Sequence, residues 1–208
     1  GLQLAAAAAL LIGVSNTSAL PATAIANATF MGALLIAVAG FACAWWYRAA
    51  GKLQLATLAY VWALAWWLGN VVTEVADFVE VGSRLHALLL LLGVTAWVAA
   101  EVQRRAPALA LSLTTLGGFV LAFPLAFLQV SEYGQPFAGH GAWAWAVFAA
   151  LGVRSLICLR AGSGRVAGLA QLAWWLLWPT VVSLLAWHVG ARFTLAEGWV
   201  GMLLALPW

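Results

Sequence analysis

Long apolar stretches follow one another along the chain, separated by short turns that hold most of the charged residues. The apolar runs extend over residues 2–14, 26–47, 53–78, 85–100, 108–130, 141–159 and 166–189, and from residue 199 onward. Most approach the ~20 residues that an α-helix needs to cross a bilayer, and none shows the strict alternation of a membrane β-strand. The pattern therefore predicts an all-α, polytopic transmembrane helical bundle of about eight segments.

The first and last runs are shorter than the others. Residues 2–14 make only ~20 Å of helix, against a hydrocarbon core of ~30 Å, and the last run is still apolar when it reaches Trp208. We interpret both as truncated segments. We therefore expect residues 1–208 to be a single transmembrane helical domain and an internal fragment of a longer chain.

Composition supports a membrane protein. Hydrophobic residues make up 66% of the chain, charged residues 7%, and the mean hydropathy is +1.02, whereas a soluble domain is about half apolar and a quarter charged. The basic residues are divided among several turns, so we expect membrane lipids as partners and no nucleic acid. Cys43 and Cys158 lie in apolar runs without metal-binding spacing, which predicts free thiols.

Charge differs between alternate loops and predicts an orientation. The loops at residues 47–53, 101–106 and 160–166, together with nearby Arg154, contain seven of the nine basic residues, whereas the opposite loops contain five of the six acidic residues. By the positive-inside rule the basic loops are cytoplasmic.

Two segments resemble each other. Residues 60–69 and 169–178 both contain a Trp-Trp pair after alternating Ala and Leu, and both follow a short basic turn. One interpretation is a weak parallel repeat of residues 26–78 and 141–189. The alternative is chance similarity in a sequence rich in Ala, Leu and Trp.

Tryptophan occurs 14 times, and the residues at the ends of runs are typical of interfacial anchors. Trp62, Trp66, Trp174 and Trp175 lie nearer the middle of their segments, where an indole N–H needs a hydrogen-bond partner. With Asn70, they are our candidates for a groove that binds a lipid or another ligand. Core packing is the commoner role of such residues.

Polar residues gather at the end of the run 53–78. Asn70, Glu74 and Asp77 have i, i+4, i+7 spacing and so lie on one helix face. Paired carboxylates handle protons or act as general acid and base, which makes Glu74 and Asp77 the candidate catalytic residues. A solvated helix end is the alternative.

The three histidines are predicted on the same side of the membrane. His140 and His188 lie at one end of the hairpin formed by residues 141–189, where they can approach each other as metal or haem ligands. No HxxxH, HExxH or CxxCH motif accompanies them. Plain interfacial histidines are therefore the alternative, and no cofactor is assigned.

Short strings in this chain resemble a known family. Ala-Trp-Trp-Tyr-Arg at residues 44–48, Ala-Leu-Ala-Trp-Trp-Leu-Gly-Asn-Val-Val-Thr-Glu at residues 63–74, and the histidine before Ala-Trp-Ala-Trp at residues 142–145 are similar to large, uncharacterised bacterial multi-pass membrane proteins with a domain of unknown function. The resemblance implies a longer chain with an envelope role in the bacterial inner membrane. It implies no catalytic residues.

Our leading hypothesis is a non-enzymatic inner-membrane module of a bacterial envelope protein. It acts either as a scaffold, in contact with other envelope proteins or further parts of its own chain, or as a groove for a lipid or lipid-linked glycan. One alternative is a membrane enzyme that acts on a lipid-linked substrate at the outer face through Glu74 and Asp77. Another is a haem- or quinone-handling protein, because Trp-rich segments beside histidines are similar to cytochrome c assembly proteins, although their Trp-Asp signature is absent.

Overall fold

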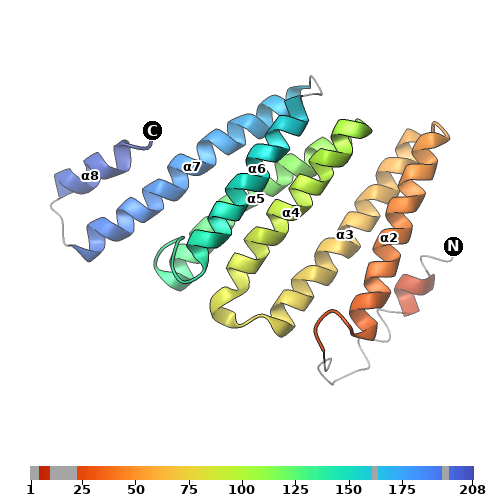
Figure 1. The fold of residues 1–208 in the computed structure, drawn as a ribbon, viewed down its shortest axis with the longest axis horizontal. Helices are drawn as coiled ribbons and strands as arrows, with labels where there is room; N and C mark the ends of the chain where they lie inside the picture. The colour runs from red at the N-terminus through yellow and green to blue at the C-terminus, as the bar shows by residue number, and fades with distance from the viewer. Residues whose placement is uncertain (1–4, 10–22, 161–163, 194–196) are drawn as a thin grey trace. The chain divides into compact units, whose positions relative to one another are not determined.

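The computed structural model describes residues 5–9, 23–160, 164–193 and 197–208, which are almost entirely helical and contain no strand. The all-α prediction is thus confirmed. The elements in chain order are α2 (Ala28–Ala49), α3 (Leu53–Phe78), the 3-10 helix η1 (Val81–Ser83), α4 (Arg84–Arg105), α5 (Leu109–Tyr133), α6 (Gly141–Arg160), α7 (Arg165–Arg192) and α8 (Glu197–Ala205) (Figure 1).

In the described part of the chain, six helices, α2 to α7, are long and apolar enough to cross a membrane. The predicted number of about eight is not confirmed. Helix α8 has nine residues, or ~14 Å, which is too short for a ~30 Å core. Of the first predicted run, only residues 5–9 are described, as helix, and its remainder lies outside the described residues. Helix α4 continues one turn beyond its predicted run, to Arg105.

The chain divides into two compact units, residues 1–81 and 82–208. Unit 1 is built on the hairpin of α2 and α3, which pack closely because small residues meet: a Cβ on Gly40 would lie 2.8 Å from the Cβ of Ala63. Helix α2 begins at Asn27, whose Oδ1 accepts a hydrogen bond from the Phe30 N–H at 2.7 Å.

Unit 2 contains α4 to α8. Helix α4 packs against both α5 and α6, α5 packs against α7, and α8 packs against α7. Because α4 to α7 run in alternating directions (Figure 1), one end of this bundle, called the basic end, collects arginines. These are Arg104, Arg105, Arg160 and Arg165. The other end, called the histidine end, is defined by His86, Tyr133, His140 and His188.

The two predicted repeat copies are packed differently. The backbones of α2 and α3 run close together, whereas the backbones of α6 and α7 pack mainly on α4 and α5 and these two helices meet through large aromatic side chains. The parallel repeat and the single transmembrane domain both stay predictions.

Aromatic side chains fill the core of unit 2. Trp174 contacts the rings of Phe119, Phe148 and Trp178, with centroids 5.2, 6.1 and 5.4 Å apart. A Cβ on Gly152 would overlap the six-membered ring of Trp174, so the absence of a side chain on α6 allows this indole to lie against the helix backbone.

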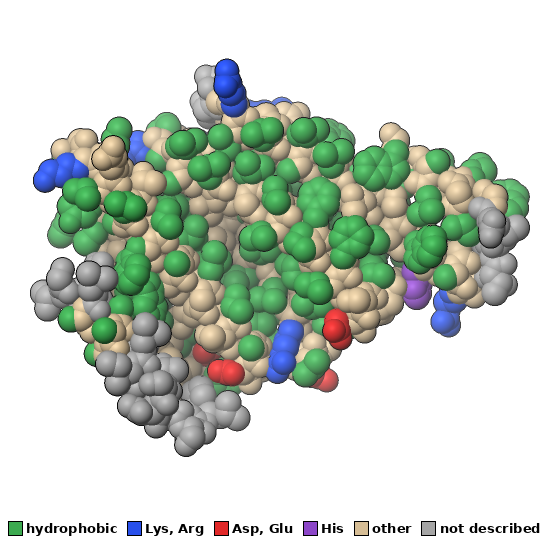
Figure 2. Space-filling model, turned by 180° about the vertical axis from the view of Figure 1, so that it is seen from behind, with side chains coloured by type: hydrophobic (Ala, Val, Ile, Leu, Met, Phe, Trp, Pro, Cys, Tyr) green, Lys and Arg blue, Asp and Glu red, His purple; other side chains and the backbone are tan. Residues whose placement is uncertain are grey.

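The outer surfaces of the helices are apolar. Large hydrophobic side chains such as Leu109, Trp143 and Trp175 are well exposed. On the face shown in Figure 2, hydrophobic side chains are spread over the helices and charged side chains lie toward the helix ends. A water-soluble protein rarely exposes so much contiguous apolar surface, and the six long helices therefore identify a multi-pass membrane protein.

Candidate functional site

A cleft with a volume of about 370 Å³ lies at the basic end of unit 2, between α4 and α6. It is lined by residues of α4 that recur at every fourth position, and by one residue of α6. They are Trp97, Val98, Glu101, Val102, Arg104, Arg105 and Arg154. Two rows with i, i+4 spacing, one beginning at Trp97 and one at Val98, place most of these residues on one side of α4.

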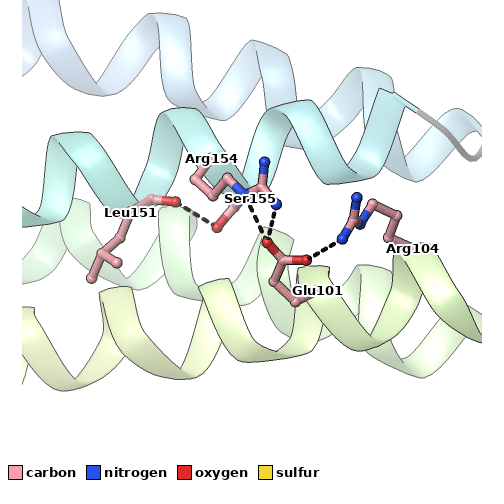
Figure 3. Close-up of polar contacts among 5 residues, drawn as sticks. All are labelled: Glu101, Arg104, Leu151, Arg154 and Ser155. Carbon is pink, nitrogen blue, oxygen red and sulfur yellow. Dashed lines mark hydrogen bonds and ion pairs between the residues drawn. The ribbon is translucent and has the colours of Figure 1, made fainter.

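An ionic triad closes one side of the cleft. Arg154 donates from both Nε and Nη2 to Glu101 Oε1, each at 2.6 Å, and Arg104 Nη2 lies 3.2 Å from Glu101 Oε2 (Figure 3). The Glu101 side chain is 20% exposed, whereas Arg104 and Arg154 are 44% and 46% exposed. Glu101 therefore holds both guanidinium groups in place while leaving much of their surface open.

The charge of the cleft is positive. Three arginines lie beside one carboxylate, Glu101, so the lining has a formal charge of +2. Arg105 is exposed and makes no ion pair within the described residues. Because each guanidinium has five N–H donors and no acceptor, the cleft offers donors to an anion rather than to a cation.

The other wall of the cleft is apolar. Val98 and Val102 are exposed there, and Trp97 presents an indole whose Nε1 is buried with no hydrogen-bond partner in the described part of the chain. A buried N–H normally has an acceptor. The cleft thus places guanidinium groups and apolar side chains within one small volume.

Local hydrogen bonds fix the backbone around this site. At the end of α4, Gln103 Oε1 accepts from the Ala108 N–H at 2.6 Å and so closes the turn into α5. On α6, the Ser155 hydroxyl donates to the Leu151 carbonyl at 2.7 Å (Figure 3) and thereby avoids an unpaired hydroxyl in the helix interior.

The polar face predicted on α3 is partly assembled in unit 1. Asn70 Nδ2 donates to the Phe30 carbonyl at 3.1 Å. The Glu74 carboxylate accepts from the Ile25 N–H and, at 3.3 Å, from Asn27 Nδ2. Both side chains thus bind the beginning of α2.

Asp77 does not share these contacts with the start of α2. Its side chain is exposed, one turn beyond Glu74. The carboxylate of Glu74, in contrast, is held by backbone and amide donors. The two-carboxylate catalytic site stays a prediction.

The tryptophans proposed for a groove have different surroundings. Trp62 and Trp66 contact each other edge to face on α3, at 5.8 Å between centroids. In unit 2, Trp174 is buried in the aromatic core, whereas the next residue, Trp175, is 64% exposed. Trp174 and Trp175 therefore face different surroundings, and the ligand-groove role of these tryptophans stays a prediction.

His140 and His188 contact different residues at the histidine end. His140 Nδ1 lies 3.4 Å from the Ser83 hydroxyl, while the ring of His188 packs against Gly134, with Cε1 3.3 Å from where a Cβ would be. Among the described residues, no group of three or more His, Cys, Asp or Glu side chains is arranged to hold a metal ion. Cys43 and Cys158 are not joined in a disulfide.

Comparisons with known proteins assign no family. No family model matches the chain, and no curated protein and no solved structure is significantly similar to it. The resemblance to large bacterial multi-pass proteins therefore stays a prediction.

Proposed function

We propose that this chain is a non-enzymatic membrane module of a bacterial envelope protein and that it binds the phosphate-bearing headgroup of an anionic lipid. The binding site is the cleft between α4 and α6. The observation that carries this proposal is that three arginines and an apolar wall of Trp97, Val98 and Val102 line one cleft.

The arginines suit a phosphate. A planar guanidinium matches two phosphate oxygens, and charge-assisted hydrogen bonds are about twice as strong as neutral ones. The ion pairs with Glu101 hold Arg104 and Arg154 in one arrangement before a ligand arrives. A pre-ordered side chain loses less entropy on binding, which favours affinity.

The position along the helix suits a lipid. The arginines lie in the last turn of α4 and in the final two turns of α6, and the apolar residues Trp97 and Val98 lie about two turns further from the end of α4. A headgroup at the arginines can therefore continue as an acyl chain along Trp97 and Val98. Basic pockets between transmembrane helices on the cytoplasmic side typically bind anionic lipids, and the positive-inside rule favours a cytoplasmic position for this end.

Native mass spectrometry tests the proposal. The delipidated chain in mild detergent is titrated with phosphatidylglycerol and, separately, with zwitterionic phosphatidylcholine. We expect tighter binding of phosphatidylglycerol. The variant Arg105→Gln should weaken that binding roughly fivefold, because a basic residue near a lipid headgroup contributes about 1 kcal/mol.

Arg165→Gln is the matched control, because Arg165 is exposed at the same end but does not line the cleft. Arg105 makes no ion pair within the described residues, so its replacement tests charge without opening the triad. Equal losses in the two variants, or equal binding of the two lipids, would contradict a site in the cleft. An undecaprenyl diphosphate titration distinguishes a lipid-linked carrier from a phospholipid as the ligand.

A further inference from the structure

Three polar atoms are buried without a partner at the histidine end of unit 2. His86, in the first turn of α4, is 3% exposed, and Gln129, near the end of α5, is fully buried. The two ring nitrogens of His86 and the Nε2 of Gln129 make no hydrogen bond within the described residues.

The orientation of the Gln129 amide follows from its neighbour. Trp145 Nε1 donates to Gln129 Oε1 at 2.9 Å, and an indole nitrogen is only a donor. The oxygen of Gln129 must therefore face Trp145, which leaves the Nε2 with its two N–H donors unpaired. Turning the amide around would place two donors against each other.

A neutral imidazole needs two different partners. One ring nitrogen donates and the other accepts, and buried groups of this kind are nearly always paired with protein or with ordered water. The rings of His86 and Tyr133 are tilted by 31° with centroids 4.9 Å apart, but this contact satisfies neither nitrogen. Gln129 lies one helical turn before Tyr133 and hence on the same face of α5.

The space beside His86 is small. A Cβ on Gly141 would lie 3.0 Å from His86 Nε2 and would overlap the carbonyl oxygen of Pro136. Backbone thus closes one side of the ring and leaves no room there for a bulky ligand. A water molecule is small enough and has two donors and two acceptors, so it pairs with an imidazole in either tautomer and with an amide N–H.

We propose that ordered water is bound at the histidine end beside His86 and Gln129. This water connects the buried imidazole with the solvent near His140, which is exposed and lies 3.4 Å from Ser83, the residue before α4. His86 then exchanges its ring proton with solvent from this end of the bundle. The site does not depend on lipid binding, because the cleft lies at the opposite end of α4.

Solid-state NMR of the full chain in phospholipid vesicles tests the proposal. The chain contains three histidines, so ¹⁵N-histidine labelling gives a simple spectrum that His140→Gln and His188→Gln assign. A second sample is labelled with ¹⁵N-tryptophan, in which the loss of one signal in Trp145→Phe identifies the Trp145 Nε1. Magnetisation is transferred from water protons to nitrogen. We expect transfer to His86 as well as to exposed His140. We expect little transfer to Trp145 Nε1, because this buried N–H already donates to Gln129 and needs no water.

The variant Gln129→Met removes the amide donors while keeping a side chain of similar length. It should reduce water transfer to His86 and leave transfer to His140 unchanged. If Gln129→Met does not fold, the proposal is tested by comparing water transfer to His86 with water transfer to Trp145 in the unmodified chain. Transfer from water to His86 that is as weak as transfer to Trp145 overturns the proposal. The proposal is also overturned if the ¹⁵N shifts of His86 show a hydrogen-bonded imidazole that receives no magnetisation from water.

Discussion

Replacing Gly152 by alanine should destabilise unit 2 through one contact. The added Cβ would overlap the six-membered ring of Trp174, and this ring cannot move aside easily because Phe119, Phe148 and Trp178 surround it. Overpacking of this kind costs about 1–3 kcal/mol, and the enclosure of the ring places the cost in the upper part of that range. Alanine gains about 1 kcal/mol of helix propensity over glycine, so we expect a net loss of about 1–2 kcal/mol.

The assay is unfolding of the purified chain during titration of mild detergent with SDS, followed by helical circular dichroism. Gly168→Ala is the matched control, because Gly168 is exposed on α7 and no atom of the described residues lies within 4 Å of its Cβ position. We expect it to be neutral or slightly stabilising. Trp174→Phe removes the overlapping ring, so in the double variant the second substitution should recover part of the loss caused by Gly152→Ala.

Two results would refute this reasoning about Gly152. One is an unchanged unfolding midpoint in Gly152→Ala. The other is simple additivity of Gly152→Ala and Trp174→Phe within about 0.5 kcal/mol, which is the behaviour of residues that do not touch.

Further substitutions test other parts of the two units. Asn70→Ala should lower the stability of unit 1 by about 1 kcal/mol, because a buried hydrogen bond to the α2 backbone is lost, and SDS titration measures it; no change would mean that Asn70 does not hold the hairpin. Glu74→Gln should be milder than Glu74→Ala, since the amide oxygen can still accept from the Ile25 N–H; equal losses would contradict this. Gln129→Leu should cost about 1–3 kcal/mol by leaving the Trp145 N–H buried and unpaired, and a smaller effect on the unfolding midpoint would show that another acceptor replaces Gln129.

The helices of this protein were largely predictable because run length alone decides which segments cross a membrane. The predicted number of about eight segments is not confirmed, and the end of α4 also differs from the prediction. Residues 101–105 include three charged side chains and were predicted as a loop, yet the helix continues through them to Arg105. Ion pairing between Glu101 and its arginine neighbours and the reach of long basic side chains toward water make charged residues compatible with the end of a transmembrane helix.

The cleft was harder to predict from the sequence. Charge counting placed Glu101 and Arg154 on the same side of the membrane, but their contact joins α4 to α6 across 53 positions. A signal was present: Arg154 lies inside an apolar run, where a charge needs a partner, and Glu101 is the one acid among the basic loops. Trp97, His86 and Gln129 gave no comparable signal until their surroundings were known.

The tryptophans show why helix orientation could not be predicted. In a soluble protein the buried face of a helix is the apolar face, but a membrane helix is apolar toward lipid as well as toward its neighbours. Trp174 and Trp175 are therefore equivalent in the sequence, although one is buried and the other is 64% exposed.

The most direct test of the lipid-binding account is a distance measurement between lipid phosphorus and arginine. The chain is labelled with ¹⁵N-arginine, placed in phosphatidylglycerol vesicles, and examined by ³¹P–¹⁵N dipolar recoupling in the solid state; the variants Arg154→Lys and Arg165→Lys identify the two signals by their loss. We expect strong dephasing of the Arg154 guanidinium by phosphorus and much weaker dephasing of Arg165. Equal dephasing of both, or none at Arg154, would contradict a phosphate site in the cleft between α4 and α6.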